Sequence, residues 1–210
     1  MRDVHAIQGG RMNEIQLQKA ALRKDLRRLA AQHSAAERAA ASEQIRQRLR
    51  AQPQWQQART VMGFVPMPEE PDIWPLVTET LAAGKRVALP RYDAANDCYW
   101  AHEVKDCLLE VCPGYYGIGE PMASCPRFDL KELDFIMVPG LGFAANGSRL
   151  GRGKGYYDHL LRQAGGWKCG VAFDWQIVAG IPMDGSDVYL DCIMTPSAGS
   201  SVGTPPPVVK

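Results

Sequence analysis

Short apolar runs alternate along the chain with segments whose apolar residues recur at helical spacing. Apolar or alternating runs of this length predict strands at 60–65, 86–89, 98–104, 135–138, 169–173 and 192–194. Hydrophobic periodicity and capping residues predict helices at 14–32, 34–51, 73–83 and from near Asp158 to Ala164. Strands that alternate with helices across short connections indicate a mostly parallel sheet covered by helices. We therefore expect a single α/β domain over residues 1–210.

Both ends of the chain have the composition of flexible segments. Residues 1–13 are polar and include a Gly-Gly pair, and residues 197–210 are rich in Ser, Gly and Pro. We expect the first segment to be frayed and the second to be an extended, disordered tail.

The predicted first helix carries two different faces. Leu22, Leu26 and Leu29 share one face at spacing i, i+4, i+7, which indicates packing against the body of the protein. Lys19 and Arg23 belong to a cationic stripe on another face. From the residues alone, such a stripe is typical of a solvated helix surface.

The composition sets limits on compartment and partners. The 210 residues are 46% hydrophobic and 22% charged, with a net charge of +1, so no overall field attracts nucleic acid or acidic membranes. No apolar run approaches the ~20 residues that span a bilayer, and residues 1–12 lack the apolar region of a secretory signal. The six cysteines form no CxxC pair or zinc spacing, which favours reduced thiols. We expect a cytoplasmic monomer.

The most informative stretch runs from Asp134 to Leu161. Its apolar strand ends at Pro139-Gly140, and Asn146-Gly147 marks a tight turn. Three cations and three glycines follow within seven residues, namely Arg149, Gly151, Arg152, Gly153, Lys154 and Gly155. Glycines let backbone N–H groups form an anion-binding nest, and Arg and Lys add charge that suits a polyphosphate. A strand, a basic glycine loop and a helix N-terminus in this order predict a phosphate site; the alternative is a solvated flexible loop.

Two common nucleotide-binding motifs do not fit this stretch. A P-loop ending in Gly153-Lys154 requires Gly at 148 and Ser or Thr at 155, where the chain has Ser148 and Gly155. A dinucleotide fingerprint that begins at Gly140 would open a helix, but Asn146-Gly147 opens a turn. The residues therefore favour a phosphate site of another kind.

Two segments of this stretch resemble the signature of the 5-formyltetrahydrofolate cyclo-ligase family, also called methenyltetrahydrofolate synthetases. They are Val-Pro-Gly-Leu-Gly-Phe at 138–143 and Arg-Leu-Gly-Arg-Gly-Lys-Gly-Tyr-Tyr-Asp at 149–158. The resemblance extends from about residue 19 to residue 195. It implies a three-layer α/β sandwich, with a mostly parallel sheet and helices on both faces, similar to sugar-phosphate isomerases and CoA transferases.

The resemblance also implies an activity. Members of this family cyclise 5-formyltetrahydrofolate to 5,10-methenyltetrahydrofolate, with ATP as co-substrate, Mg²⁺ as cofactor, and ADP and phosphate as products. Transfer of the γ-phosphoryl group to the formyl oxygen makes that oxygen a good leaving group, and N10 of the folate attacks the activated carbon. Because the substrate supplies the nucleophile, no catalytic triad is needed, and the four scattered histidines indicate none.

The resemblance assigns roles to particular residues. The candidate catalytic residues are Arg149, Arg152 and Lys154, since phosphoryl transfer requires positioning and charge stabilisation. The residues implied to bind ATP are Lys19, Arg23, Arg149, Leu150, Gly151, Arg152, Gly153, Lys154, Gly155, Tyr156 and Tyr157. The residues implied to bind the folate are Glu70, Tyr116, Arg152, Gly153, Lys154, Gly155 and Tyr156. Asp158 and Asp187 are the implied Mg²⁺ ligands, although the residues alone suit a helix N-terminus and a turn equally well.

Two departures from the family pattern and two other functions stay open. Pro71-Asp72-Ile73 follows Glu70 where the family has Val or Ile, an acid and Thr, and Ala144 stands where the family often has Asp. An isomerase or CoA-transferase-like enzyme could use Glu69, Glu70 or Glu120, and independence from ATP would favour it. A non-catalytic nucleotide- or folate-binding module would bind both ligands without turnover.

Overall fold

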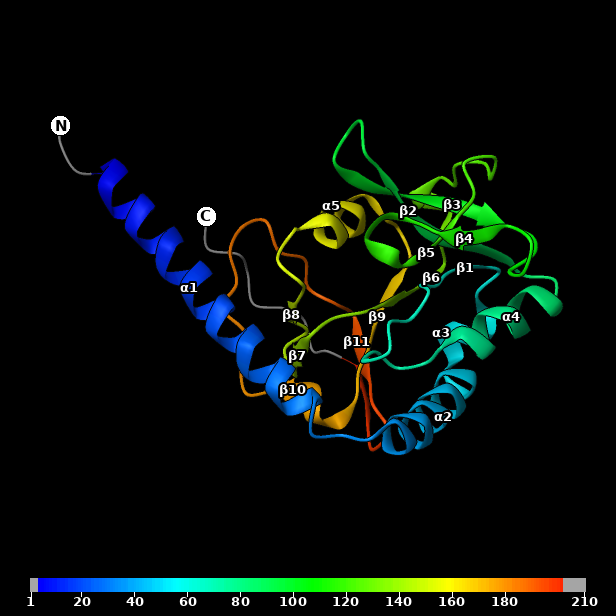
Figure 1. Cartoon of the computed structure of the whole chain (residues 1–210), viewed down its shortest axis with the longest axis horizontal. Coiled ribbons are helices and arrows are strands. Elements are labelled where there is room, and N and C mark those ends of the chain that lie inside the picture. The colour runs from blue at the N-terminus through cyan, green and yellow to red at the C-terminus, as the bar shows by residue number, and fades with distance from the viewer. Residues whose placement is uncertain (1–3, 202–210) are drawn as a thin grey trace.

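A mixed β-sheet lies at the centre of the computed structural model, which describes residues 4–201 (Figure 1). Within this range the main sheet has seven strands in the order β12-β11-β9-β6-β1-β2-β3. Their bounds are β1 Thr60–Met62, β2 Arg86–Asp93, β3 Cys98–Val104, β6 Phe135–Val138, β9 Trp167–Val171, β11 Cys192–Met194 and β12 Gly199–Ser201. Neighbouring strands from β11 to β2 are parallel, and only the edge strands β3 and β12 are antiparallel. The prediction of a mostly parallel sheet is confirmed.

Helices cover both faces of this sheet. The bounds are α1 Val4–Ala30, α2 Ala35–Ala51, α3 Pro53–Gln57, α4 Trp74–Ala82 and α5 Tyr156–Gln163, with 3-10 turns at Tyr115–Gly117, Leu130–Glu132 and Asp174–Gln176. Helices α2, α3 and α4 pack on one face and α5 packs on the other, as expected for three layers (Figure 1). No helix within residues 4–201 has the length and apolar character needed to cross a membrane.

The central strands contribute to two separate cores, because successive side chains of a strand point to opposite faces. In β6, Phe135 and Met137 pack with α2, α3 and α4, whereas Ile136 and Val138 pack with α5. All four side chains are completely buried. A strand that is covered on both faces is apolar at every position, which is why this run is recognisable in the sequence.

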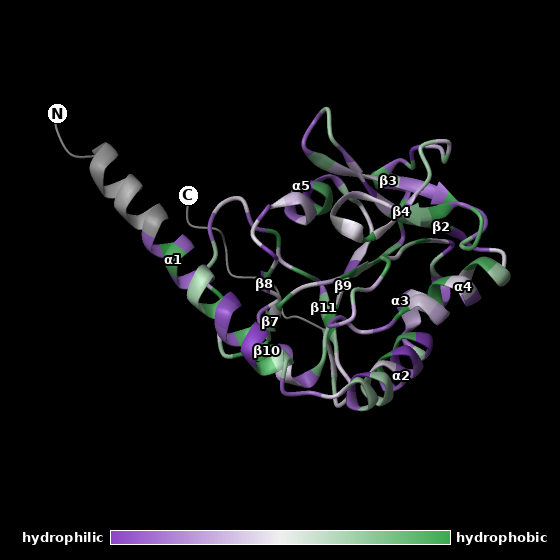
Figure 2. Ribbon diagram, in the orientation of Figure 1, coloured by the Kyte–Doolittle hydropathy of each residue, from purple (hydrophilic) through white to green (hydrophobic). Residues whose placement is uncertain are grey.

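Helix α2 begins where its capping residues predict. The Ser34 hydroxyl oxygen accepts a hydrogen bond from the Glu37 backbone N–H at 3.2 Å, and Glu37 Oε2 accepts one from the Ser34 N–H at 2.7 Å. This reciprocal pair satisfies two N–H groups at the start of the helix. Ile45 and Leu49 are buried in the core, while Figure 2 shows hydrophilic residues elsewhere along the helix.

A small three-stranded sheet, absent from the expected elements, holds the stretch that follows β6. Its order is β10-β7-β8, with bounds β10 Ile177–Val178, β7 Gly142–Ala144 and β8 Arg149–Leu150. Gly147 has φ 84° in the turn from β7 to β8, and Asn146 Oδ1 accepts from the Ser148 N–H at 3.1 Å. The turn thus forms with Ala144 in place of an acid, and Arg149 lies in a strand rather than in a flexible loop.

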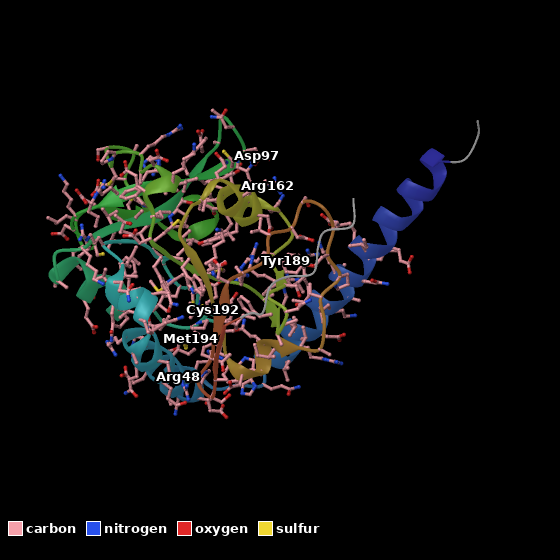
Figure 3. The ribbon with its side chains drawn as sticks, turned by 180° about the vertical axis from the view of Figure 1, so that it is seen from behind. Arg48, Asp97, Arg162, Tyr189, Cys192 and Met194 are labelled. Carbon is pink, nitrogen blue, oxygen red and sulfur yellow. The ribbon has the colours of Figure 1, made fainter. Side chains whose placement is uncertain are left out.

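Both ends of the chain differ from the expectation. Helix α1 begins at Val4, before the expected Glu14, and so extends into the segment predicted to be frayed. Strand β12 pairs with β11 within the predicted disordered tail. Arg48 Nε on α2 donates to the Pro196 carbonyl at 2.6 Å and fixes the chain just before this strand (Figure 3). The remainder of the predicted tail, residues 202–210, lies outside the described residues.

Several interior boundaries also require correction. Strand β1 ends at Met62 rather than at residue 65, and β9 begins at Trp167 rather than at residue 169. Strand β2 continues past residue 89 to Asp93, because it pairs with β3 as far as Cys98. Leu29, expected on the packed face of α1, is 36% exposed.

Helix α4 forms despite the departure from the family pattern before it. The Trp74 N–H donates to Asp72 Oδ1 at 3.0 Å, just where the helix starts. Ile73 beside it is completely buried. The segment that follows Glu70 therefore retains a defined helix start.

Candidate active site

A cavity of about 400 Å³ lies between the basic glycine loop and the carboxyl edge of the parallel sheet. Phe64 comes shortly after β1 and Pro139 directly after β6, and both line the cavity. Open α/β sheets bind ligands at this edge, beyond the carboxyl ends of the strands. The geometry therefore marks the cavity as the candidate site.

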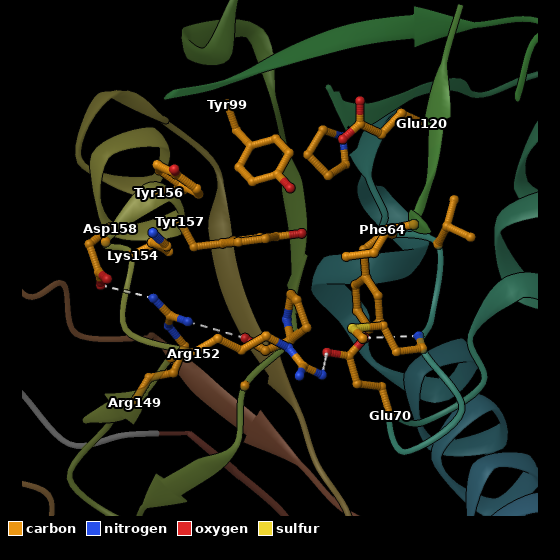
Figure 4. A pocket seen from close by; sticks show the side chains of 18 of the residues that line it. Phe64, Glu70, Tyr99, Glu120, Arg149, Arg152, Lys154, Tyr156, Tyr157 and Asp158 are labelled. Atoms are coloured by element: carbon orange, nitrogen blue, oxygen red, sulfur yellow. Dashed lines mark hydrogen bonds and ion pairs between the residues drawn. The ribbon is translucent and has the colours of Figure 1, made fainter. Parts of the chain in front are cut away.

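The cavity has an apolar wall and a charged wall. The apolar wall includes Phe64, Val65, Pro90, Tyr99 and Ile118, and the charged wall includes Arg149, Arg152, Lys154 and Asp158. Figure 4 shows Phe64 and Glu120 on the opposite side of the cavity from Lys154 and Asp158. This division suits a ligand, or a pair of ligands, with both an apolar ring and an anionic group.

The glycine loop requires glycine at two positions. Gly153 has φ 109° and Gly155 has φ 72°, which side chains rarely tolerate, and Gly155 is the N-cap residue of α5. The helix N-terminus therefore begins at the loop, where it favours negative charge. Lys154, between the glycines, is exposed and has no carboxylate within ion-pair distance among the side chains that the structure describes. Its ammonium group is available to an anionic ligand.

Arg149 and Asp158 join the start of β8 to the first turn of α5. Arg149 Nη2 donates to Asp158 Oδ1 at 2.9 Å, and the two side chains are only 3% and 15% exposed. The Val188 N–H donates to the same oxygen at 3.4 Å. Arg149 Nε is buried without a hydrogen-bond partner among the described residues. The pair thus fixes the orientation of the charged wall while leaving one donor of the guanidinium unsatisfied.

Arg152 links the loop to the acidic segment before α4. Its Nη2 donates to Glu69 Oε1 at 2.9 Å and to Glu70 Oε1 at 3.0 Å. Glu70 Oε2 accepts from the Met67 N–H at 3.1 Å, so both of its oxygens are hydrogen-bonded. The Glu70 side chain is 8% exposed, whereas that of Glu69 is 39% exposed.

The two predicted basic residues of α1 lie behind the glycine loop. Lys19 Nζ contacts Asp184 Oδ2 at 3.0 Å and Asp187 Oδ2 at 2.5 Å, and Lys19 is 4% exposed. Arg23 Nε donates to the Gly151 carbonyl at 2.9 Å. The interpretation of this stripe as a solvated surface is therefore wrong for Lys19, which is buried because it neutralises two carboxylates.

Tyr156 and Tyr157 extend the loop into an aromatic cluster. The Tyr156 hydroxyl donates to Asp97 Oδ1 at 2.6 Å, at the end of the β2–β3 hairpin. The Tyr99 ring contacts both, with centroid distances of 5.4 Å to Tyr156 and 6.2 Å to Tyr157. Burial raises the pKa of Tyr157 well above its usual value, so its hydroxyl stays protonated.

Comparison with known proteins places this geometry in a family. The model of the 5-formyltetrahydrofolate cyclo-ligase family matches residues 15–196. The chain belongs to this family. Among curated relatives, 5-formyltetrahydrofolate cyclo-ligase of Mycolicibacterium smegmatis is 34% identical over 67% of this chain and 75% of its own length. The mouse cyclo-ligase is 29% identical over 84% of this chain and 92% of its own length.

A solved structure of a cyclo-ligase relative agrees with the fold. The 5,10-methenyltetrahydrofolate synthetase of Aquifex aeolicus has a TM-score of 0.79 and 31% identity. The match covers 91% of this chain and 96% of the other. The similarity to sugar-phosphate isomerases and CoA transferases is not tested by these comparisons and stays a prediction.

Most, but not all, of the predicted cyclo-ligase site residues gather at the cavity. The predicted residues that line it are Glu70, Arg149, Gly151, Arg152, Lys154, Gly155, Tyr156, Tyr157 and Asp158. Four predicted residues do not line the cavity. They are Lys19 and Arg23 on α1, Gly153 in the loop beside Arg23, and Asp187, which contacts Lys19. The Leu150 side chain is 1% exposed in the core, so only its backbone can reach a ligand. The side chain of Tyr116 lies outside the described part of the chain, and its role stays a prediction.

Ten lining residues have no cyclo-ligase role assigned from the sequence, among them Phe64, Tyr99 and Glu120. In the sequence, Phe64 and Tyr99 resemble ordinary core residues of strands. Phe64 reaches the cavity because β1 ends before it, and Tyr99 because β3 pairs with β2. Glu120 enters from the sequence only as one of three acids for the isomerase alternative. Its position beside a Gly-Pro segment could have marked it as a loop residue with a fixed orientation.

Proposed function

We propose that this chain catalyses the ATP-dependent cyclisation of 5-formyltetrahydrofolate to 5,10-methenyltetrahydrofolate, with release of ADP and phosphate. Family membership supports the activity. The single observation that carries the proposal to this site is the cavity itself, in which an apolar wall faces a basic glycine loop at a helix N-terminus. That arrangement suits a folate ring and the phosphates of ATP together.

The residues support transfer of a phosphoryl group from ATP to the formyl oxygen. A formamide oxygen is a poor leaving group, and its phosphorylation converts it into phosphate. N10 of the folate then attacks the formyl carbon, a C–N bond forms, N10 releases its proton to water, and the C–O bond breaks with loss of phosphate. Because phosphoryl transfer depends mainly on positioning and charge, the protein needs no nucleophile of its own.

Lys154 and the two arginines have different tasks in this proposal. Lys154 has no carboxylate partner among the described side chains and neutralises charge on the transferred phosphoryl group. Arg149 is fixed by Asp158 and directs its remaining donors at phosphate oxygens, including the buried Nε. Arg152 is held by Glu69 and Glu70 at the boundary between the two walls, where the formyl group and the γ-phosphate must meet.

Helix α1 supports the phosphate site from behind. Arg23 holds the Gly151 carbonyl, and its guanidinium lies beside Gly153, where an added side-chain carbon would lie 3.4 Å from Arg23 Cζ. Arg23 therefore adds positive charge under the loop. Lys19 acts on Asp187 and Asp184, and we assign it to the position of those carboxylates as well as to the charge of the site.

The proposal includes Mg²⁺ bound with ATP, and the oxygen donors present fit a hard cation. Asp158 accepts its hydrogen bonds from the described residues through Oδ1, which leaves Oδ2 for a ligand. Asp187 lies near Asp158, because the backbone N–H of the next residue, Val188, donates to Asp158 Oδ1. Together they would hold Mg²⁺, which prefers few carboxylates beside water and phosphate oxygens and would neutralise phosphate charge. Among the side chains that the structure describes, no group of three or more His, Cys, Asp or Glu residues is placed to hold a metal ion.

The direct test is a reconstitution assay. The protein, 5-formyltetrahydrofolate, ATP and Mg²⁺ are mixed, and the absorbance of the methenyl product is followed. Product that forms only when ATP and Mg²⁺ are both present supports the proposal. Binding of both ligands without product would favour the non-catalytic module, and turnover without ATP would favour the isomerase-like alternative.

The compartment and assembly state belong to the same proposal. All six cysteines lie within the described residues as free thiols, and five of them are buried. Free thiols are typical of a reducing compartment. We propose a monomeric enzyme of the cytoplasm, which size-exclusion chromatography with light scattering and cell fractionation can test.

A further inference from the structure

The apolar wall of the cavity contains one carboxyl group that the mechanism above does not use. Glu120 lies on β5 (Gly119–Pro121), which pairs with β4 (Val111–Pro113), and it lines the cavity while being only 3% exposed. Its Oε2 accepts from the Tyr92 N–H at 3.3 Å, and the Tyr115 backbone N–H also donates to the carboxyl group. Its Oε1 is buried without a hydrogen-bond partner among the residues whose side chains the structure describes. A buried acceptor without a partner costs free energy, so its presence beside a cavity requires an explanation.

The backbone around Glu120 is shaped to hold this carboxyl group. A side-chain carbon added at Gly114 would lie 2.4 Å from both Cγ and Cδ of Glu120, so only glycine leaves room for it. Arg91, whose charge acts on Glu120, donates its hydrogen bond to the Pro121 carbonyl instead. Glu120 is therefore built into the wall without an ion-pair partner in the described residues.

Two other acids line the cavity: Asp158 lies on the charged wall, and Glu70 is already satisfied. Glu70 receives hydrogen bonds from Arg152 on one oxygen and from the Met67 N–H on the other. Glu120 has one oxygen held and one without a partner in the part of the chain that the structure describes. Among the acids of the cavity, the capacity to accept a further hydrogen bond at the apolar wall therefore lies with Glu120.

We propose that Glu120 recognises the heterocycle of the substrate by accepting hydrogen bonds from N–H groups on its edge. In a pterin these donors are the 2-amino group and the neighbouring ring N–H. The terminal torsion of a Glu side chain is broad, so a small rotation turns either oxygen toward the cavity. Glu70 then serves chiefly to orient Arg152, and the wall formed by Phe64 and Tyr99 encloses the ring. This inference rests on the proposed function.

The first test compares two ligands on three proteins. The dissociation constants of 5-formyltetrahydrofolate, and of its analogue without the 2-amino group, are measured by calorimetry without ATP. Wild type should lose about tenfold or more in affinity when the amino group is removed. Glu120→Gln should bind 5-formyltetrahydrofolate about tenfold or more weakly and show a smaller difference between the ligands. Glu79→Gln, an exposed acid on α4, should behave as wild type.

The outcomes separate this inference from the proposed function. Equal affinity of Glu120→Gln and wild type for 5-formyltetrahydrofolate would overturn the role of Glu120, even if turnover is normal. An amino-group effect that is equal in both proteins would place recognition elsewhere and also overturn it. Failure of wild type to bind the folate at all would overturn the proposed function, and this inference with it.

A second variant and a control ligand guard against a folding defect. Glu120→Asp keeps the charge but withdraws the oxygens by one methylene group, so it should also bind the folate more weakly. The affinity of every variant for ATP should match wild type, because ATP binds at the opposite wall in this proposal. A parallel loss of ATP affinity would show general disruption of the cavity and contradict a specific role in recognition.

Discussion

Lys19 Nζ on helix α1 lies 2.5 Å from Asp187 Oδ2, in a segment 168 residues later in the chain. The same ammonium group lies 3.0 Å from Asp184 Oδ2. Lys19 is nearly inaccessible to water, so the attraction is weakly screened. This contact joins α1 to the segment that carries a proposed Mg²⁺ ligand, and it makes the position of Asp187 depend on the N-terminal helix.

Removal of Lys19 should therefore affect both stability and catalysis. Lys19→Ala leaves two partly buried carboxylates side by side, and we expect a loss of about 2–4 kcal/mol in the free energy of unfolding. Lys24→Ala, which removes an exposed lysine of the same helix, should change it by less than about 0.5 kcal/mol. Urea denaturation measures both. Equal stability of the two variants would mean that the buried ion pairs contribute nothing.

Asp184 makes this stability depend on pH. Burial alone would raise its pKa, but hydrogen bonds from Ser186 and the ion pair with Lys19 outweigh burial and lower the pKa to about 2. The folded-state pKa lies below the unfolded value, so the contribution is present above about pH 4 and is lost as pH falls toward 2. The stability difference between wild type and Lys19→Ala should shrink over this window. A difference that is constant from pH 5 to about 2 would contradict the assignment.

Asp158→Asn distinguishes a structural from a catalytic role of Asp158. The variant keeps an acceptor for Arg149 but removes the charge, and we expect a loss of about 1–2 kcal/mol in stability. If Asp158 also holds Mg²⁺, kcat should fall more than about tenfold and should recover in part at high Mg²⁺ concentration. Turnover is measured against Mg²⁺ concentration beside a thermal melt, with exposed Asp25→Asn as the control. A lower melting temperature with normal turnover at every Mg²⁺ level would show a structural role only.

Glu69 and Glu70 form a natural matched pair, because both accept from Arg152 Nη2. Glu70→Gln removes the buried partner and should lower kcat/KM for the folate about tenfold or more. Glu69→Gln removes an exposed partner, whose contribution is typically below about 1 kcal/mol, and should change kcat/KM less than about fivefold. Steady-state kinetics on both substrates separates the two. Similar losses in both variants would mean that the combined negative charge of the two acids, and not Glu70 in particular, positions Arg152.

The burial of Glu120 predicts a gain in stability when its charge is removed. Burial raises the pKa of this carboxyl group, although backbone N–H groups of Tyr92 and Tyr115 and the charge of Arg91 oppose the shift. A carboxyl group whose pKa is raised in the folded state contributes to stability at low pH, and this contribution is lost as the pH rises through the folded-state pKa. Glu120→Gln should therefore melt higher than wild type at pH 7 and equal to it near pH 4. A variant that melts lower at pH 7 would show that the carboxylate stabilises the fold.

Local sequence predicted the parts of the site whose contacts are also local. Arg149 and Asp158 are nine residues apart and belong to one motif, so their proximity follows from the strand–loop–helix order. The apolar run of β6 and the capping box of Ser34 were likewise recognisable, because periodicity and capping are local properties. Lys19 was expected to contact phosphate, but its burial against Asp187 depends on a contact that no local pattern encodes.

The sequence could not predict the contacts that depend on strand pairing or on the room left by a glycine. The strand expected at 86–89 continues through Pro90, because pairing with β3 extends β2 to Asp93. Glu120 resembles a loop acid in the sequence, and only the absence of a side chain at Gly114 explains how its carboxyl group is buried. Tertiary context overrides local propensity at both positions.

The most direct test of the proposed reaction follows the formyl oxygen. 5-Formyltetrahydrofolate labelled with ¹⁸O in the formyl group is converted with ATP and Mg²⁺, and the inorganic phosphate is analysed by mass spectrometry. Phosphoryl transfer to the formyl oxygen requires that oxygen to leave with phosphate, so the label should appear in inorganic phosphate at one atom per methenyl group formed. Label that appears in water, with unlabelled phosphate, would contradict the mechanism.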